Sequence, residues 1–147
     1  MNYHIYTTIL YIHVFSVILS IGPFFILLPF IKKLRGANED VEQSYLNLFR
    51  FTVQVSKHAG HVLVVTGILL VWVTSWTWKT SWIVMTVLVM LSSGYFLARA
   101  FSPTVRKFND PTKDKEKSIH ILYRSTWAYV ILLMIMLWFM VAKPVWW

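Results

Sequence analysis

The run IYTTILYIHVFSVILSIGPFFILLPFI, residues Ile5 to Ile31, decides the fold because it contains no Lys, Arg, Asp or Glu. A helix needs roughly 20 mostly apolar residues to cross the hydrocarbon core of a bilayer, so this run is long enough to span a membrane with some tilt. It has no basic segment in front of it, and its apolar part is too long for a cleavable signal peptide. Pro23 lacks a backbone N–H group, and we therefore expect a kink in the helix near this residue.

Three further apolar runs follow at about residues 53–76, 82–101 and 119–142. The whole chain of 147 residues is 57% hydrophobic and only 14% charged, whereas soluble domains carry about 25% charged residues. The sequence therefore predicts an all-α integral membrane protein, in which residues 1–147 form a single antiparallel bundle of four transmembrane helices.

The basic residues predict how this bundle is oriented. Twelve of the fourteen Lys and Arg residues lie in or beside the connections 32–52 and 102–118, and only Lys79 and Lys143 lie on the opposite side. Cytoplasmic connections are enriched in basic residues. We therefore expect a multi-pass protein of the bacterial inner or plasma membrane, with both charged connections in the cytoplasm and with extracytoplasmic N- and C-termini. Five tryptophans are expected to form a belt at the outer interface: Trp76, Trp78, Trp82, Trp146 and Trp147.

The composition excludes several classes of function. The chain has no cysteine, so disulfides, thiolate metal sites and thiol catalysis are ruled out. The formal charge is +8, but basic residues beside apolar spans typically contact anionic headgroups, so we expect the lipid bilayer as a partner and no nucleic acid. All six acidic residues fall in the two charged connections, and no nucleophile–base pair, phosphate loop or carboxylate pair is present. The sequence therefore assigns no catalytic residue.

Histidines in the spans are the main candidates for chemistry, because ionisable groups inside a membrane are costly and are often functional. His13 shares one helix face with Ser16 and Ser20, and this face is expected to point into the bundle. His58 and His61 are three residues apart and therefore lie close together on the second span. Each imidazole either forms a hydrogen bond with a neighbouring helix or binds a metal or haem.

A haem or metal site can be placed in two ways. His13 and His61 are candidate ligands of haem or a metal, although the helical rise of about 1.5 Å per residue puts them at depths that differ by about 10 Å. The alternative is a site near the cytoplasmic side, formed by His58 and His61 with His120, which begins the fourth span. Basic side chains at that level either bind haem propionates or anchor the spans at the interface: Lys57, Arg99 and Arg124.

Small residues and methionines are interpreted as packing groups. Gly60 and Gly67 on the second span and the segment 92–94 on the third predict points of close helix contact. Methionine together with histidine can bind Cu(I), but no closely spaced methionine pair stands beside a histidine. We therefore expect haem b ahead of copper as the ligand of the span histidines.

The segment YIHVFSVILSIGPFFILLPFIKKL resembles the first helix of a superfamily of small bacterial membrane proteins. This superfamily includes uncharacterised integral membrane proteins, the copper-resistance D family and the HemJ-type protoporphyrinogen oxidases. The segments VVTGILLVWV and SWIVMTVLVMLSSGYFLARAF are similar to the second and third helices of these proteins. The resemblance covers about residues 3–101 and implies a four-helix membrane protein with His13 as a ligand of haem b or a metal. Thr86 and Phe96 stand where the oxidases carry lysine and histidine, which argues against protoporphyrinogen oxidase activity.

Three functions remain open at this point. The first is a membrane-embedded protein that binds haem b or a metal and acts in electron transfer or cofactor handling. The second is a non-catalytic accessory subunit of a larger membrane complex, which the small-residue faces favour. The third is a small oligomeric transporter of a metal or another cation. The second function implies a membrane-protein partner, and the third implies a homo-oligomer.

Overall fold

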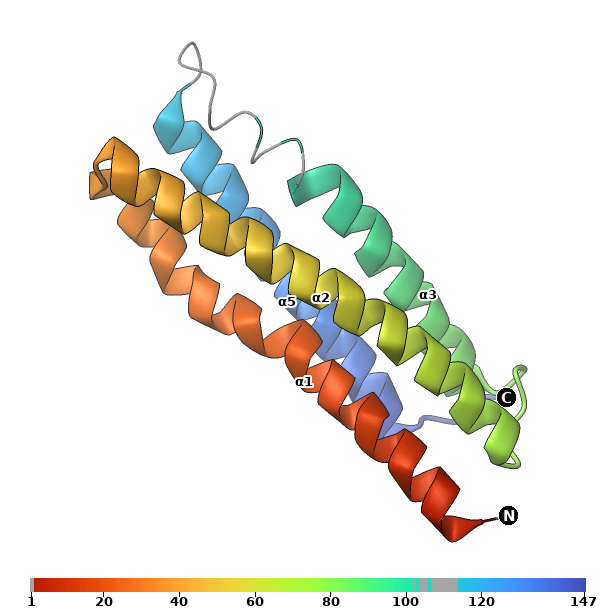
Figure 1. Ribbon diagram of the computed structural model, residues 1–147. Helices are drawn as coiled ribbons and strands as arrows, with labels where there is room; N and C mark the ends of the chain where they lie inside the picture. The colour runs from red at the N-terminus through yellow and green to blue at the C-terminus, as the bar shows by residue number, and fades with distance from the viewer. Residues whose placement is uncertain (1, 102, 104–105, 107–113) are drawn as a thin grey trace.

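The computed structural model describes residues 2–101, 103, 106 and 114–147. This part of the chain forms four long helices, which are α1 (Tyr3–Lys33), α2 (Glu39–Val73), α3 (Ser81–Phe96) and α5 (Lys115–Ala142). Two short turns extend them: the 3-10 turn η1 (Leu34–Gly36) after α1, and the π-helical turn η2 (Leu97–Phe101) after α3. Figure 1 shows the helices side by side in one bundle, with both termini at the same end. Most of the predicted connection 102–118 lies outside the described residues.

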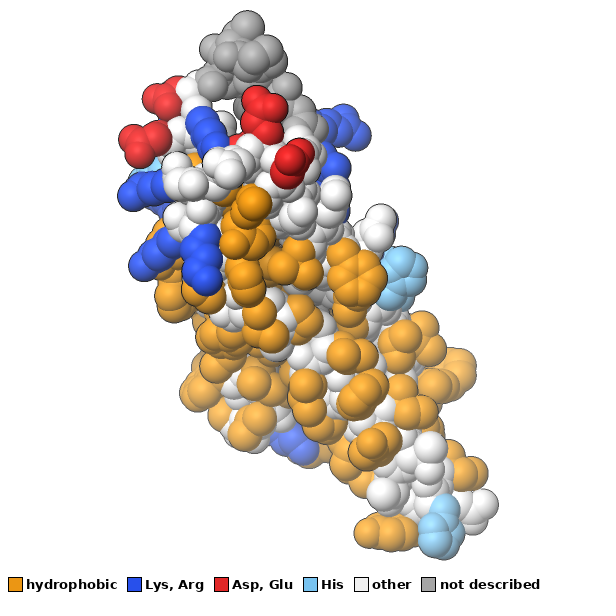
Figure 2. All heavy atoms as spheres, turned by 60° about the vertical axis from the view of Figure 1, so that its left-hand side comes forward, with side chains coloured by type: hydrophobic (Ala, Val, Ile, Leu, Met, Phe, Trp, Pro, Cys, Tyr) orange, Lys and Arg blue, Asp and Glu red, His pale blue; other side chains and the backbone are white. Residues whose placement is uncertain are grey.

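All four helices are long and apolar enough to cross a membrane. The candidate spans are Tyr3–Gly36, Glu39–Val73, Ser81–Phe101 and Lys115–Ala142. Less than half of the most apolar stretch of each span is buried inside the bundle, and Figure 2 shows apolar side chains covering the body of the molecule. A continuous apolar surface of this size requires lipid as its solvent. The four-helix bundle predicted from the sequence is confirmed, and the protein is a multi-pass membrane protein.

α1 and α2 are each continuous. α1 contains Pro23 and Pro29 and remains helical on both sides of them, because a proline removes only one intrahelical hydrogen bond. α2 begins after Asn38, and the acidic residues of its first turn are favourable near the positive end of the helix dipole. With 35 residues, α2 is about 52 Å long. It therefore extends past a hydrocarbon core of about 30 Å.

The two ends of the bundle differ in chemistry. At the end where α2 and α5 begin, which we call the charged end, Glu42 forms an ion pair with Lys115. At the opposite end, which we call the aromatic end, the C-terminal tail folds back onto the start of α3. There the Ser81 hydroxyl donates to the carbonyl oxygen of Pro144 over 2.8 Å and accepts from the backbone N–H of Trp146 over 3.0 Å. Figure 2 shows acidic and most basic side chains gathered at the charged end, with the apolar body below.

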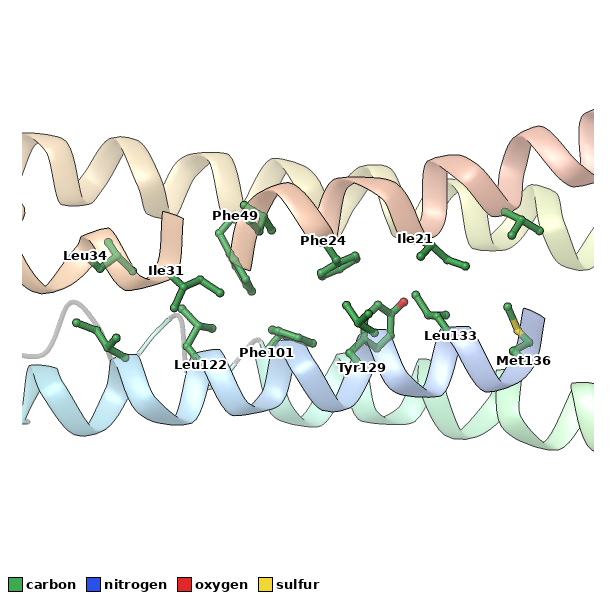
Figure 3. Packing of buried hydrophobic residues seen from close by; sticks show 14 of the residues in the cluster. Ile21, Phe24, Ile31, Leu34, Phe49, Phe101, Leu122, Tyr129, Leu133 and Met136 are labelled. Atoms are coloured by element: carbon green, nitrogen blue, oxygen red, sulfur yellow. The ribbon is translucent and has the colours of Figure 1, made fainter. Parts of the chain in front are cut away.

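One aromatic side chain joins all four helices in the core. Phe101 of η2 is 1% exposed. Its ring centroid lies 6.0 Å from that of Phe24 on α1 and 5.3 Å from that of Phe49 on α2. The ring of Tyr129 on α5 lies 5.7 Å away, and Figure 3 shows these rings between the facing helices. The end of α3 is thereby fixed to the rest of the bundle.

The helices differ in how closely they pack. α1 packs along α2 and along α5, and α3 packs along α5. α2 and α3 are consecutive in the chain, but they barely touch along their lengths. The space between them forms the groove described next.

Candidate functional site

A groove of about 530 Å³ lies between α2 and α3. This volume falls within the range of roughly 300–1,000 Å³ that is typical of sites for small molecules and cofactors. α2 and α3 supply the walls, and α1 and α5 supply the floor. The lining residues are Val53, Lys57, Gly60, His61, Leu63, Val64, Met90, Leu91, Ser93, Gly94, Tyr95, Leu97 and Ala98 on the walls, with Ser20, Ser56, Tyr129, Leu133 and Met136 below.

The floor of the groove carries a buried cluster of hydroxyl groups. Ser56 on α2 donates to the carbonyl oxygen of Ser20 on α1 over 3.0 Å, and the two serine Oγ atoms are 3.3 Å apart. The Tyr129 hydroxyl lies beside both serine side chains. All three residues are less than 5% exposed. Buried polar groups need such partners, so this cluster holds α1, α2 and α5 together and gives the floor a polar spot.

His61 and Lys57 lie on the α2 wall, one helical turn apart. His61 forms no hydrogen bond with any described residue. Within that part of the chain, both of its ring nitrogens are therefore available to a ligand. Met90 on α3 and Met136 on α5 bring thioether groups to the same groove. The α2–α3 groove therefore combines an imidazole, an ammonium group and two soft sulfur ligands within largely apolar walls.

His13 lies at a different place, in the closed interface between α1 and α2. Its Nδ1 is 2.9 Å from the Thr66 hydroxyl, and that hydroxyl is 2.7 Å from the carbonyl oxygen of Val62. The Thr66 hydroxyl and Nδ1 of His13 are thus hydrogen-bonded, and the tautomer of the imidazole sets which of the two donates. The ring packs over Gly67, where an added Cβ would lie 3.4 Å from Cε1 of His13. This histidine thus links two helices, one of the two interpretations that the sequence left open.

His13 and His61 are not brought together. Thr66, the partner of His13, follows His61 by five residues on α2. At 3.6 residues per turn, the two side chains point about 140° apart around the helix axis. His61 faces the α2–α3 groove, whereas His13 contacts the side of α2 that is packed against α1.

The predicted cluster near the charged end is also spread out. His58 is exposed, and its Nδ1 is 2.8 Å from the carbonyl oxygen of Gln54 in its own helix. His120 is exposed on α5, nine residues before Tyr129, or about 13 Å closer to the charged end. Within the described residues, no three His, Asp or Glu side chains come close enough to hold a metal ion.

The two arginines proposed for haem propionates lie outside the lining of the α2–α3 groove. The guanidinium carbon of Arg99 is 5.5 Å from the ring centroid of Tyr95, which itself lines the groove. Arg124 is exposed on α5. Of the predicted basic residues, Lys57 alone contributes directly to the lining that the structure describes.

No family model matches the chain, and no curated protein or solved structure matches it. The function is therefore inferred from the chemistry of the α2–α3 groove.

The sequence missed this groove because its small residues were interpreted as points of close helix contact. That interpretation is right for Gly67, which lies against His13. It is wrong for Gly60 and Gly94, because a Cβ added at either position would meet no atom within 4 Å. The spacing of small residues is the same in open and closed interfaces, so only the arrangement of neighbouring helices separates the two cases.

Proposed function

We propose that this protein binds haem b in the α2–α3 groove and uses it in electron transfer or cofactor handling. The observation that carries the proposal is His61, a histidine without a hydrogen-bonding partner among the described residues, on the wall of a groove of cofactor size.

The donor set of the groove fits haem. A haem iron accepts histidine and methionine as axial ligands, and His61 lies on one wall with Met90 on the other. Lys57, one turn from His61, is placed to pair with a propionate, since ammonium groups bind carboxylates through charge-assisted hydrogen bonds. The apolar wall residues would exclude water from the porphyrin. Bound haem would supply a one-electron carrier, and the protein would hold and orient it.

The charge pattern supports an orientation for this site. Basic residues dominate the charged end, and we infer from the positive-inside rule that this end is cytoplasmic and that both termini are extracytoplasmic. The resemblance to small bacterial membrane proteins with a haem-linked branch favours the same proposal, with one change. We propose that His61, in place of His13, would hold the haem iron, because His61 lines the α2–α3 groove whereas His13 lies in the closed interface between α1 and α2.

The test is the haem content of the protein purified after expression with a haem supply. We expect a pyridine haemochrome signal and a reduced-minus-oxidised difference spectrum from the wild-type protein, and loss of most bound haem in His61→Ala. His58→Ala is the matched control, because this exposed histidine lies on the same helix and bonds to its own backbone. A colourless wild-type protein, or equal losses in both variants, would rule the proposal out.

One observation favours a second function, that of an accessory subunit. Small residues line both walls of the groove, with Gly60 on α2 and with Gly94 and Ala98, four residues apart, on the opposite side. Such faces allow a transmembrane helix to approach closely. A partner helix in the groove predicts a colourless protein that co-purifies at fixed stoichiometry with another membrane protein. Haem binding predicts a coloured protein that is stable alone, so the spectrum of the wild-type protein distinguishes the two functions.

A further inference from the structure

A second cluster lies away from the groove, at the seam between α1 and α5 near the charged end. The ammonium nitrogen of Lys32 on α1 lies 5.2 Å from the ring centroid of Tyr123 on α5. The hydroxyl of Tyr123 has the donors of Trp127 and Lys32 as its neighbours. Tyr123 thus positions the ammonium group of Lys32 across the seam, where Lys32 remains exposed.

The outer face of α5 changes in chemistry along its length. His120, Arg124, Trp127 and Ile131 follow one another at spacings of three or four residues, so they share one face of the helix. All four are exposed. From the charged end toward the middle of the bundle, this face presents an imidazole, a guanidinium group, an indole and an aliphatic side chain. The same order of groups, from cationic to aromatic to aliphatic, matches the headgroup, interface and acyl region of a lipid leaflet.

The positive charges at this seam have no acidic partner among the described residues. The ion pair at the charged end joins Lys115 of α5 to Glu42 of α2, and no described carboxylate lies within 4.0 Å of the side-chain nitrogens of Lys32 or Arg124. Glu116 lies on α5 eight residues before Arg124, or about 12 Å closer to the charged end. In Figure 2 the acidic side chains likewise lie at the tip, and basic side chains lie between them and the apolar body. Within the described residues, Lys32 and Arg124 are therefore exposed cations that can pair with an anion from outside the chain.

We propose that the seam between α1 and α5 is a binding site for an anionic phospholipid. Lys32 and Arg124 bind the phosphate, since basic groups between transmembrane helices recognise anionic headgroups. Tyr123 and Trp127 lie at the level of the glycerol, and the acyl chains follow the exposed aliphatic face that begins at Ile131. This site is independent of the α2–α3 groove and of haem.

The test is lipid retention by the purified protein in nanodiscs and by native mass spectrometry, with phosphatidylglycerol compared with phosphatidylcholine. A basic group that pairs with the bound headgroup contributes about a factor of five in affinity, so the double variant Lys32→Ala with Arg124→Ala should bind phosphatidylglycerol about thirtyfold more weakly. Phosphatidylcholine retention should not change. The single variant Lys32→Arg should keep most of the phosphatidylglycerol binding that the single variant Lys32→Ala loses. This comparison separates loss of charge from misfolding.

Lys33→Ala is the matched control, because Lys33 is the next residue and its ammonium nitrogen lies 5.4 Å from the ring centroid of Phe30, a different aromatic partner. We expect this variant to bind phosphatidylglycerol like the wild type. An equal loss in Lys33→Ala would show a general charge effect and would overturn the site. Complete displacement of bound phosphatidylglycerol by soluble glycerol 3-phosphate would overturn the assignment to a lipid, because the acyl chains would then contribute nothing to binding.

Discussion

α2 has two sides that differ in how closely a neighbouring helix packs against them. Toward α1, the side chains of Ser56 and Thr66 contact Ser20 and His13, and Gly67 lies directly under the His13 ring. Toward α3, Lys57 and His61 line the groove, and Gly60, which shares a helix face with Gly67 seven residues later, would meet no atom within 4 Å through an added Cβ. The first side is a closed helix interface, and the second is an open one. Small residues in a membrane helix therefore mark places where another helix or a ligand can approach closely. The position of the neighbouring helix decides whether such a place is already occupied.

The largest effect is expected from filling the closed side. Gly67→Leu would force a side chain into the His13 ring, and overpacking of this kind costs about 2 kcal/mol. Gly94→Leu should leave the stability of the protein unchanged, because that position is open, while it fills the groove and removes bound haem. Thermal unfolding in detergent measures both. Equal destabilisation by the two changes would show that the groove is closed in solution.

The next largest effect on stability is expected for the hydroxyl cluster on the floor of the groove. Ser56→Ala removes the donor to the Ser20 carbonyl oxygen and a neighbour of the buried Tyr129 hydroxyl, so it should cost about 1 kcal/mol. Ser92→Ala is the control, since Ser92 is exposed and donates to Leu88 in its own helix. The unfolding midpoint should fall only in the first variant. A larger loss in Ser92→Ala would contradict the assignment of the closed interface.

A smaller effect is expected for the link between Thr66 and His13. Thr66→Val keeps the shape and removes the hydroxyl, and interhelical hydrogen bonds in membranes contribute about 0.6 kcal/mol on average. Thr74→Val changes a hydroxyl that bonds only to Leu70 in its own helix and should have less effect. The same unfolding assay applies, and bound haem should stay constant in both variants. Loss of haem in Thr66→Val but not in Thr74→Val would indicate that His13 is a haem ligand.

The smallest effect on stability is expected for the ion pair at the charged end, away from both of these sides of α2. Glu42→Gln removes the ion pair with Lys115 at the charged end. Ion pairs with an exposed partner contribute little, so we expect a loss below about 0.5 kcal/mol that disappears at high salt. The unfolding midpoint at low and high ionic strength measures it. A loss comparable to that of Ser56→Ala would show that the charged end has its own folded core.

The architecture could be predicted from the sequence, whereas the open side of α2 could not. Apolar runs longer than a bilayer core require helices, and helical spacing placed His13, Ser16 and Ser20 on one inward face, which the burial of both serines and the His13–Thr66 contact confirm. The gap beside Gly60 depends on how far apart α2 and α3 lie. That separation results from contacts of α3 with α5 and with the tail, which no local pattern in α2 reports.

The attachment of α3 at its two ends has a mechanical consequence. Near one end Ser81 is tied to the C-terminal tail, and at the other end Phe101 is wedged among rings from the other helices. Between these two attachment points, one flank of α3 packs against α5 and the other flank borders the groove. These attachments hold the gap beside α2 open on the side of the bundle, where a molecule dissolved in the bilayer would reach the groove laterally.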